Sequence, residues 1–431
     1  MSEANRRQFL KHGAVVATAV PLAVHAAGSS DTLKVGLVGC GGRGTGAALQ
    51  ALKADKNVKL VAMADAFEDK ISNSIASLKK ESAADGKIDV PSDRRFTGFD
   101  AYKHVVDSVD VVLLATPPHF RPMHLAYAIE RGRHVFAEKP VAVDGKGVRS
   151  VLESCEKARK KGLSVVSGLC LRYYNCFQET MEKIHAGEIG DVVCLQANDY
   201  RGGIWNRTRE QLAGTIGRDP TEMEYQMRNW YHFTWLSGDF NVEQHVHFLD
   251  VCAWVLQDRY PARCVCMGAR QTRPGNGGNI YDQFSAIYDY DDGVKVYSNT
   301  RHIRGYKVYS NMGATVKATK GNGEISEYKN RHHLNIADKK WLFEGEHNAF
   351  YQTEHDRLFA SIRSGEPINN GEYMAKSTLM AIMARESAYT GQAITWEQAL
   401  NSKQDLSPKG YAWDAPPPRS VVAVPGVTRF V

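Results

Sequence analysis

Apolar residues in the first 170 positions form short continuous runs, separated by longer stretches with the spacing of amphipathic helices. A strand that is buried on both faces is apolar along its whole length, and parallel sheets covered by helices consist of such strands. The pattern therefore predicts an α/β domain with a doubly wound parallel sheet over residues 33–168. The predicted strands are residues 33–38 (LKVGLV), 58–64 (VKLVAMA), 110–115 (DVVLLA), 134–137 (HVFA) and 163–167 (LSVVS).

After Gly168 the pattern changes to alternating apolar and polar positions, most clearly over residues 263–329. Strict alternation is typical of strands with one face in water, so we expect a large, mainly antiparallel sheet. Residues 169–400 are thus predicted to form an α+β domain for substrate binding and oligomerisation. Residues 401–431, which contain three consecutive prolines, are predicted to be an extended C-terminal arm. Other expected elements are a strand at 192–200, an irregular aromatic-rich stretch at 202–235, and helices at 177–186, 240–256, 346–364 and 372–390.

The N-terminus has the features of an export signal. Residues 5–11 read NRRQFLK, and they are followed by an apolar run that ends in small residues, as at a signal-peptide cleavage site. This order is typical of a bacterial twin-arginine signal over residues 1–27, and the run is too short to span a bilayer. The sequence therefore predicts transport by the twin-arginine translocase, as a folded protein, to the periplasm.

Charge and composition narrow the possible partners. The formal net charge is +6, part of it within the predicted signal, and 24% of the residues are charged. There is no Lys/Arg-rich tract with interleaved aromatic residues, so we expect no nucleic-acid partner. No later segment is long and apolar enough for a stable membrane span. The eight cysteines are expected to be mainly buried free thiols, because a protein that folds in the cytoplasm does so under reducing conditions.

A glycine-rich turn follows the first predicted strand. Gly39, Gly41 and Gly44 give a G-x-G-x-x-G match that also contains Gly42 and Arg43, and a helical pattern begins at once. Such a turn lets backbone N–H groups approach a pyrophosphate at a helix N-terminus, as in the Rossmann fold. Asp65 ends the second strand and is placed to bind the adenosine ribose; its carboxylate would repel a 2′-phosphate, so NAD is expected more than NADP.

Two further groups of candidate residues end predicted strands. Thr116 and His119 follow the third apolar run, and Glu138 and Lys139 follow the fourth. In doubly wound sheets ligands bind at the carboxyl ends of the strands. These four residues are therefore candidate cofactor ligands, and Lys139 could also stabilise negative charge on a substrate oxygen.

Together, the glycine turn, Ala64-Asp65, Ala115-Thr116-Pro117 and residues 132–140 (GRHVFAEKP) resemble the Gfo/Idh/MocA oxidoreductases. The resemblance implies that Lys139 touches both the nicotinamide and the substrate, and that the substrate is a sugar, a polyol or a derivative of one. It also implies a homodimer or homotetramer built on the outer face of the large sheet.

The family signature in the second domain aligns His247 and Asp250 with a His-x-x-Asp element. Glu243 then stands where many members have an aspartate, His245 replaces a glycine, and Arg121 replaces a second histidine. On a continuous helix, Glu243, His247 and Asp250 share one face, so Glu243 could orient His247 as a proton-transfer base.

Other residues are candidates for substrate contact. Arg172 and Tyr173 resemble the family's inter-domain arginine–aromatic element, and we place them with Asp250 as substrate-binding residues. The aromatic side chains of this region could stack on a sugar ring: Trp205, Trp230, Tyr231 and Trp235. No metal site is expected, because His245 and His247 do not share a helical face.

Three functions remain open at this point. The first is hydride transfer to or from a sugar or polyol carbon, with Lys139, Glu243 and His247 as catalytic residues and NAD held tightly. The second is a redox-neutral NAD-dependent glycosidase or lyase that oxidises its substrate only transiently. The third is a sugar-binding protein that retains NAD without catalysis.

Overall fold

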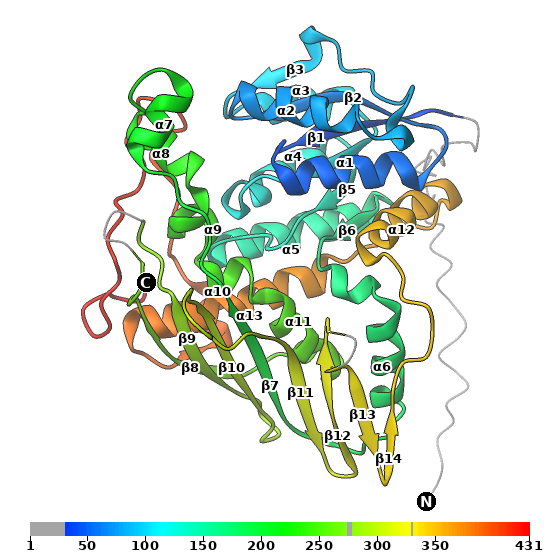
Figure 1. Ribbon diagram of the computed structural model, residues 1–431, viewed down its shortest axis with the longest axis vertical. Coiled ribbons are helices and arrows are strands. Elements are labelled where there is room, and N and C mark those ends of the chain that lie inside the picture. Colours follow the sequence, from blue (N-terminus) through cyan, green and yellow to red (C-terminus); the bar gives the residue numbers. More distant parts are fainter. Residues whose placement is uncertain (1–30, 274–277, 329–330) are drawn as a thin grey trace, which may run out of the picture.

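The computed structural model describes residues 31–273, 278–328 and 331–431. The predicted twin-arginine signal, residues 1–27, lies outside the described residues. In the described part, the chain forms two sheets with helices around and between them (Figure 1).

The first sheet is the predicted doubly wound parallel sheet, with strand order β3-β2-β1-β4-β5-β6. All of its strand pairs are parallel. Its strands are β1 (Leu33–Val38), β2 (Val58–Asp65), β3 (Arg95–Thr97), β4 (Val111–Leu114), β5 (His134–Ala137) and β6 (Val165–Ser167). Its helices are α1 (Gly42–Ala54), α2 (Glu68–Leu78), α3 (Ala101–Ser108), α4 (Arg121–Glu130) and α5 (Gly145–Lys160). Only the short edge strand β3 was missed, because its three residues carry too little pattern.

The second sheet contains nine strands within the described residues and is antiparallel except where β7 pairs with β10. Its order is β14-β13-β12-β11-β7-β10-β9-β8-β15, which confirms the predicted architecture. The strands are β7 (Val192–Arg201), β8 (Arg263–Ala269), β9 (Gln283–Asp289), β10 (Lys295–His302), β11 (Asn311–Ala318), β12 (Gly321–Ser326), β13 (His333–Ile336), β14 (Lys339–Trp341) and β15 (Ile394–Thr395). The helices of this half are α6 (Asn175–His185), α7 (Arg209–Ile216), α8 (Glu222–Arg228), α9 (Thr234–Ser237), α10 (Phe240–Glu243), α11 (Val246–Val255), α12 (Phe350–Ser364), α13 (Gly371–Thr390) and α14 (Trp396–Asn401).

The stretch expected to be irregular, residues 202–235, contains the short helices α7, α8 and α9. Thr208 and Gln211 form a capping box at the start of α7, and Thr221 accepts a hydrogen bond from the Glu224 backbone at the start of α8. These caps satisfy N–H groups that a short helix leaves unpaired. The capping residues Thr208 and Thr221 were the sequence signal for these helices. The many aromatic residues of the segment obscure the apolar spacing by which a helix is usually recognised.

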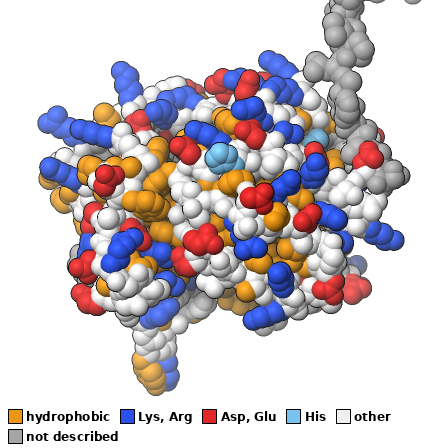
Figure 2. Space-filling model, turned by 90° about the horizontal axis from the view of Figure 1, so that it is seen from above, with side chains coloured by type: hydrophobic (Ala, Val, Ile, Leu, Met, Phe, Trp, Pro, Cys, Tyr) orange, Lys and Arg blue, Asp and Glu red, His pale blue; other side chains and the backbone are white. Residues whose placement is uncertain are grey.

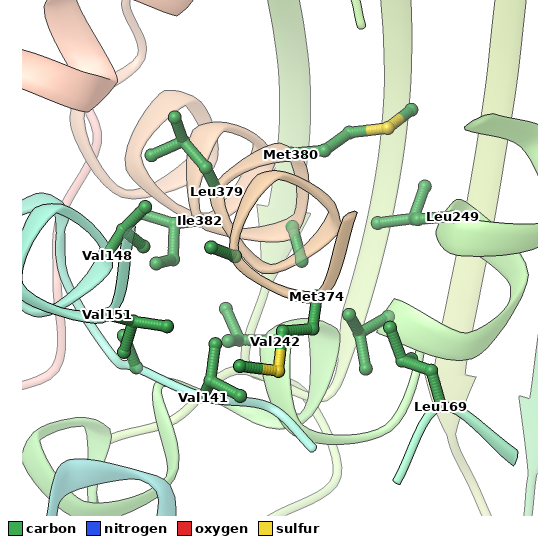
Figure 3. Close-up of a cluster of buried hydrophobic side chains, with 14 of the residues drawn as sticks. Val141, Val148, Val151, Leu169, Val242, Leu249, Met374, Leu379, Met380 and Ile382 are labelled. Carbon is green, nitrogen blue, oxygen red and sulfur yellow. The ribbon is translucent and has the colours of Figure 1, made fainter. Parts of the chain in front are cut away.

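Helix α13 lies between the two halves of the molecule. Seventeen of its 20 residues are buried, and it packs on α5 of the first half and β8 of the second. In Figure 3, Ile382 of this helix lies beside Val148 of α5, and Met374 points toward Val141 and Val242 in the same cluster. One hydrophobic core therefore continues from one sheet to the other, which fixes the two halves relative to each other.

The C-terminal residues 402–431 contain no helix or strand. Seven of the eight cysteines are buried and all eight are free, as expected. On the face shown in Figure 2, basic and acidic side chains are interspersed. Among the described residues, no helix combines the length and the apolarity needed to cross a membrane.

Candidate functional site

The glycine turn lies between β1 and α1. The backbone conformation requires glycine at position 39, and close packing of the backbone requires it at position 44. Gly39 has φ of +97°, which favours glycine. A Cβ on Gly44 would lie 1.9 Å from the Gly39 carbonyl oxygen, so only glycine lets α1 approach the turn this closely. A Cβ on Gly41 or Gly42, by contrast, would meet nothing within 4 Å. These two residues leave an open cradle at the N-terminus of α1, the geometry that receives a pyrophosphate.

A cavity of about 440 Å³ extends from this cradle. One wall comes from the parallel sheet and includes the glycines, Asp65, Phe67, Phe99, Thr116 and Phe120. The rest of the lining comes from the second half of the chain, and we call these five residues the outer wall: Trp205, Arg207, Met227, Arg228 and Trp230. We refer to this as the nucleotide cavity, because its glycine cradle and its acidic strand end fit a dinucleotide.

Asp65 stands at the end of β2, as predicted. Its Oδ2 accepts a hydrogen bond from the Cys40 backbone at 2.7 Å, and its Oδ1 accepts one from the Phe67 backbone at 3.0 Å. Burial raises the pKa of the carboxyl above its usual value, and these two backbone donors oppose that shift. The carboxylate is thus fixed in orientation, and each oxygen retains a lone pair for a ribose hydroxyl.

A second cavity of about 290 Å³ adjoins the first. The two cavities share Arg43, Ala115, Thr116 and Trp230. The three predicted catalytic residues, Lys139, Glu243 and His247, all line the second cavity. We call it the catalytic cavity. Two predicted cofactor ligands, Arg43 and Thr116, therefore lie at the junction of the two spaces.

The predicted pairing of Glu243 with His247 is not what the structure shows. The expected continuous helix is broken into α10, which ends at Glu243, and α11, which begins at Val246. The break is held by tertiary contacts: His245 bonds Ser298 at 2.7 Å, and the Tyr231 hydroxyl donates to Gln244 at 2.8 Å.

Glu243 instead holds Lys139. The Lys139 Nζ donates to the Glu243 carbonyl at 2.6 Å and to its Oε1 at 3.0 Å. Both side chains are largely buried. The glutamate thereby fixes the position of the ammonium group at the edge of the cavity.

The surroundings of His247 favour the neutral form of its imidazole. Burial lowers the pKa of its imidazole well below the usual value, and the nearby charges of Lys139 and Arg201 lower it further. Its Nδ1 is buried and has no hydrogen-bond partner among the described residues. A neutral imidazole beside a lysine can accept a proton from a substrate hydroxyl.

Arg43 and Glu138, both predicted cofactor ligands, form an ion pair with each other. Arg43 also donates to Glu354 of α12 at 2.6 Å and to Gln50 at 2.8 Å. Its guanidinium lies 4.7 Å from the centre of the Tyr351 ring. Arg43 is therefore held rigidly by α12, and Glu138 lines only the catalytic cavity.

Arg121, which replaces a histidine in the family pattern, is 1% exposed. Its guanidinium donates to backbone carbonyls at the ends of β4 and β5, those of Leu114, Thr116, Lys139 and Pro140. Burial lowers its pKa to about 10, so it stays charged at neutral pH. The arginine thus organises the two loops that carry Thr116 and Lys139.

Arg172, Tyr173 and Asp250, predicted to bind substrate, line neither cavity. Arg172 makes two hydrogen bonds to Asp250, at 2.9 and 2.8 Å, and also pairs with Asp258. The Tyr173 hydroxyl donates to Asn370. We correct this assignment: the three residues belong to a buried network that supports the fold.

His119, predicted to bind the cofactor, also lines neither cavity. Its Nε2 bonds the hydroxyl of Tyr411 in the C-terminal arm at 2.8 Å. Of the four aromatic candidates, Trp205 and Trp230 line the nucleotide cavity. Tyr231 and Trp235 instead bond Gln244 and Gln226 within the protein.

The catalytic cavity contains polar residues that sequence reasoning missed, namely Arg201, Gln244, Glu327 and Tyr351. The first ends β7, and the last belongs to α12. Gln244 lies inside the signature segment, between Glu243 and His247, but the other three lie in no motif, and only the folding of distant segments brings them to the cavity. A polar residue at the end of a long strand, as Arg201 is, was the one available signal.

Comparison with known proteins agrees with this geometry. Residues 33–167 match the model of the Gfo/Idh/MocA oxidoreductase family, described as an NAD-binding Rossmann fold. Among solved structures, an aldose–aldose oxidoreductase from Caulobacter crescentus superimposes with a TM-score of 0.65 at 16% identity, covering 84% of this chain and 99% of that one. The similarity to this structure extends the shared fold to the second domain.

Two curated relatives match over part of the chain. A 2,7-anhydro-N-acetylneuraminate hydratase from Escherichia coli is 25% identical over 186 residues, 43% of this chain and 44% of the relative. A glycosyl hydrolase family 109 protein from Bacteroides fragilis is 24% identical over 193 residues, 42% of this chain and 38% of the relative. The chain thus spans less than half the length of these relatives.

Proposed function

We propose that the protein is an NAD-dependent enzyme acting on a sugar, a polyol or a derivative of one, on the premise that residues 33–167 match the model of the Gfo/Idh/MocA oxidoreductase family. The observation that carries the proposal is the meeting of Lys139, Glu243 and His247 in a cavity that adjoins the glycine cradle.

In this proposal each residue has one task. Gly41, Gly42 and Asp65 hold the dinucleotide, whose nicotinamide supplies hydride acceptor and donor chemistry when bound. The Lys139 ammonium donates a hydrogen bond to the reacting oxygen and stabilises negative charge there. Glu243 keeps that ammonium in place, and neutral His247 takes the hydroxyl proton.

The test is to add NAD and a panel of sugars and polyols to the purified protein and to follow NADH absorbance. We expect NADH to accumulate with at least one substrate, and a Lys139→Ala variant to abolish the signal. Absence of NADH and of any product across the panel would contradict the proposal.

A second candidate is a redox-neutral reaction that uses the same residues. Its support is that the two curated relatives are named as a hydratase and a glycosyl hydrolase. In the same assay this function would give a product from a glycoside or anhydro-sugar without accumulated NADH.

We propose NAD as the preferred cofactor because the Asp65 carboxylate stands where a 2′-phosphate would lie. Equilibrium binding of NAD and NADP to the wild type and to Asp65→Ala tests this. The variant should lose about 1–3 kcal/mol of NAD binding, the scale of a hydrogen bond to a charged group. Equal affinity of the wild type for both dinucleotides would contradict the preference.

We also propose that the outer face of the large sheet pairs with a second copy of the chain. Val265, Ile287 and Tyr297 lie opposite one another on β8, β9 and β10, and each is 40% exposed or more. A row of exposed apolar side chains on a sheet favours association. Light scattering should show a dimer or a larger oligomer, and Ile287→Lys should weaken it.

Export to the periplasm also stays a proposal, which rests on Arg6 and Arg7. Replacing both with lysine should leave folded protein in the cytoplasm. Unchanged delivery of that variant to the periplasm would contradict the signal assignment.

A further inference from the structure

The ring of Phe67 contacts two residues from distant parts of the chain. The Arg228 guanidinium of α8 lies 3.9 Å from the centre of the ring, and the Trp413 ring of the C-terminal arm lies 5.1 Å from it, centre to centre. Both are favourable contacts for an aromatic ring. Phe67 lines the nucleotide cavity, and its backbone N–H orients Asp65. The acidic end of the cavity is therefore coupled to these two contacts.

Arg228 also joins the two halves of the molecule through an ion pair. Two of its nitrogens lie 3.0 and 3.3 Å from the carboxylate oxygens of Asp69, in the first turn of α2. The arginine side chain is only 6% exposed. Because Arg228 and its neighbours form the outer wall of the nucleotide cavity, this ion pair holds that wall against the parallel sheet.

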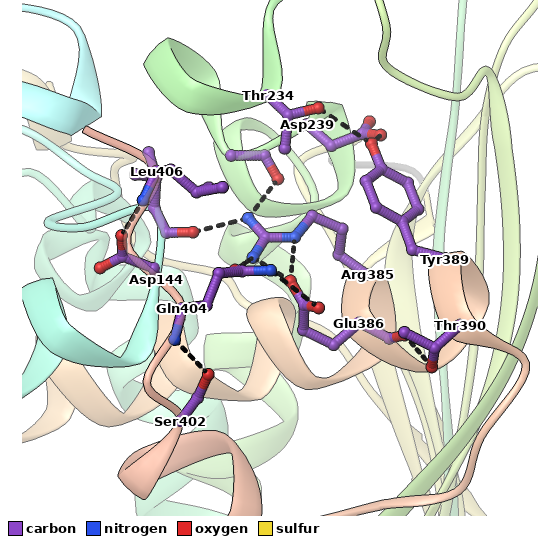
Figure 4. A network of polar contacts seen from close by, with 12 residues as sticks. Asp144, Thr234, Asp239, Arg385, Glu386, Tyr389, Thr390, Ser402, Gln404 and Leu406 are labelled. Carbon is purple, nitrogen blue, oxygen red and sulfur yellow. Dashed lines mark hydrogen bonds and ion pairs between the residues drawn. The ribbon is translucent and has the colours of Figure 1, made fainter. Parts of the chain in front are cut away.

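The C-terminal arm reaches the same region and runs beside α7 and α8 in Figure 1. Its beginning is fixed where Gln404 bonds Arg385 and where the Leu406 N–H donates to Asp144 (Figure 4). Its last part is fixed by the Tyr281 hydroxyl, which donates to the Ala423 carbonyl at 2.8 Å, and by Ser402, which donates to the Val431 carbonyl.

Between these anchors the arm lies on the nucleotide-binding half. Trp413 contacts Phe99 as well as Phe67, with 4.7 Å between the ring centres. Tyr411 packs against Phe99 and Phe120 and bonds His119. Phe67, Phe99 and Phe120 all line the nucleotide cavity, so the arm packs against three of its lining rings.

We propose that α8 and the arm form a latch that retains the dinucleotide, with Arg228 and Trp413 as its two contact points on Phe67. This rests on the proposed function, because it takes the cavity to be the cofactor site. Release of a molecule as long as a dinucleotide requires the outer wall to separate from the sheet. Separation breaks the Arg228–Asp69 pair and frees the Phe67 ring, so the latch slows dissociation.

The experiment measures the release of bound NADH directly, by the fall of its fluorescence after dilution into excess NAD. We expect Trp413→Ala and Asp69→Asn each to raise the release rate about tenfold, the factor that corresponds to about 1.4 kcal/mol. Asp69 is half-exposed, so its variant keeps the protein folded even if Trp413→Ala does not. Val427→Ala is the matched control, because this arm residue is 74% exposed and should leave the rate unchanged.

The outcomes separate the two proposals. If NADH binds and leaves both variants at the wild-type rate, the latch is wrong while the proposed function stands. If the wild-type protein binds neither NADH nor NADPH, the proposed function fails and the latch fails with it.

Discussion

The two adjoining cavities are built on different physical principles. The nucleotide cavity is shaped by backbone: a glycine turn, a strand end and aromatic walls. The catalytic cavity is shaped by charge, because Lys139 pairs with Glu243 and Arg43 pairs with Glu138 at its edge.

This difference determines how each cavity responds to substitution. A backbone-shaped cavity fails when atoms are added, because a new Cβ either collides with the backbone, as at Gly44, or fills space meant for the ligand, as at Gly41. A charge-shaped cavity fails when one partner is removed, because the remaining charge is left without compensation in a site of low dielectric.

Arg172 lies outside both cavities and neutralises Asp250, which is 1% exposed. Arg172→Ala should lower the free energy of unfolding by about 3–5 kcal/mol, the usual cost of breaking a buried ion pair. Denaturant titration measures this. Asp258→Asn is the control, since this exposed partner should cost less than about 1 kcal/mol. An Arg172→Ala protein that is as stable as the wild type but has a raised KM would show that Arg172 binds substrate after all.

Lys139→Ala should lower kcat about 100-fold or more, because the reacting oxygen loses its charged hydrogen-bond donor. NAD binding should change little, since Lys139 lines only the catalytic cavity. Single-turnover kinetics and a separate NAD titration give the two quantities. If the variant lost NAD binding but kept its turnover, the assignment of separate binding and catalytic roles to the two cavities would be wrong.

The backbone-shaped part of the molecule was largely predictable from sequence. The continuous apolar strands, the glycine turn and Asp65 at the end of β2 depend on residues close together in the chain, so local pattern identifies them. The family resemblance added Lys139 and His247, and both line the catalytic cavity.

The charge-shaped part was predictable only as a set of residues, not as a set of pairs. Glu243 was expected to bind His247, four positions away, but it binds Lys139, 104 positions away. His119 bonds Tyr411, 292 positions away. A polar side chain can form hydrogen bonds of similar energy with several partners. Tertiary packing decides which partner is within reach, and the spacing of residues along the chain carries no information about that packing.

Gly44→Ala and Gly41→Ala form a matched pair on the glycine turn. The first places a Cβ 1.9 Å from the Gly39 carbonyl oxygen, and the second places it in open space. Overpacking of this kind costs about 1–3 kcal/mol, so Gly44→Ala should unfold at lower denaturant concentration. Gly41→Ala should keep its stability and lose only NAD affinity. Equal stability of the two variants would show that the turn adapts, and that backbone does not fix the cavity.

The smallest expected effect is the response of turnover to mild acid. A histidine with the ordinary pKa of about 6.5 is half protonated at pH 6.5, so a base of that kind would lose half of its activity there. Burial and the charges of Lys139 and Arg201 lower the pKa of His247, and the imidazole therefore stays neutral as the pH falls through 6.5. We expect kcat/KM to stay flat between pH 7.5 and about 6.5 and to decline only below that range.

Stability must be followed in parallel, because the same shift affects folding. In the unfolded chain His247 takes up a proton below about pH 6.5, whereas the folded protein excludes that proton, so acid favours the unfolded state in this range. Circular dichroism at each pH separates loss of fold from loss of base. A twofold fall in kcat/KM at pH 6.5 with the fold intact would mean that the base is an ordinary solvated histidine, and that charge does not control the catalytic cavity.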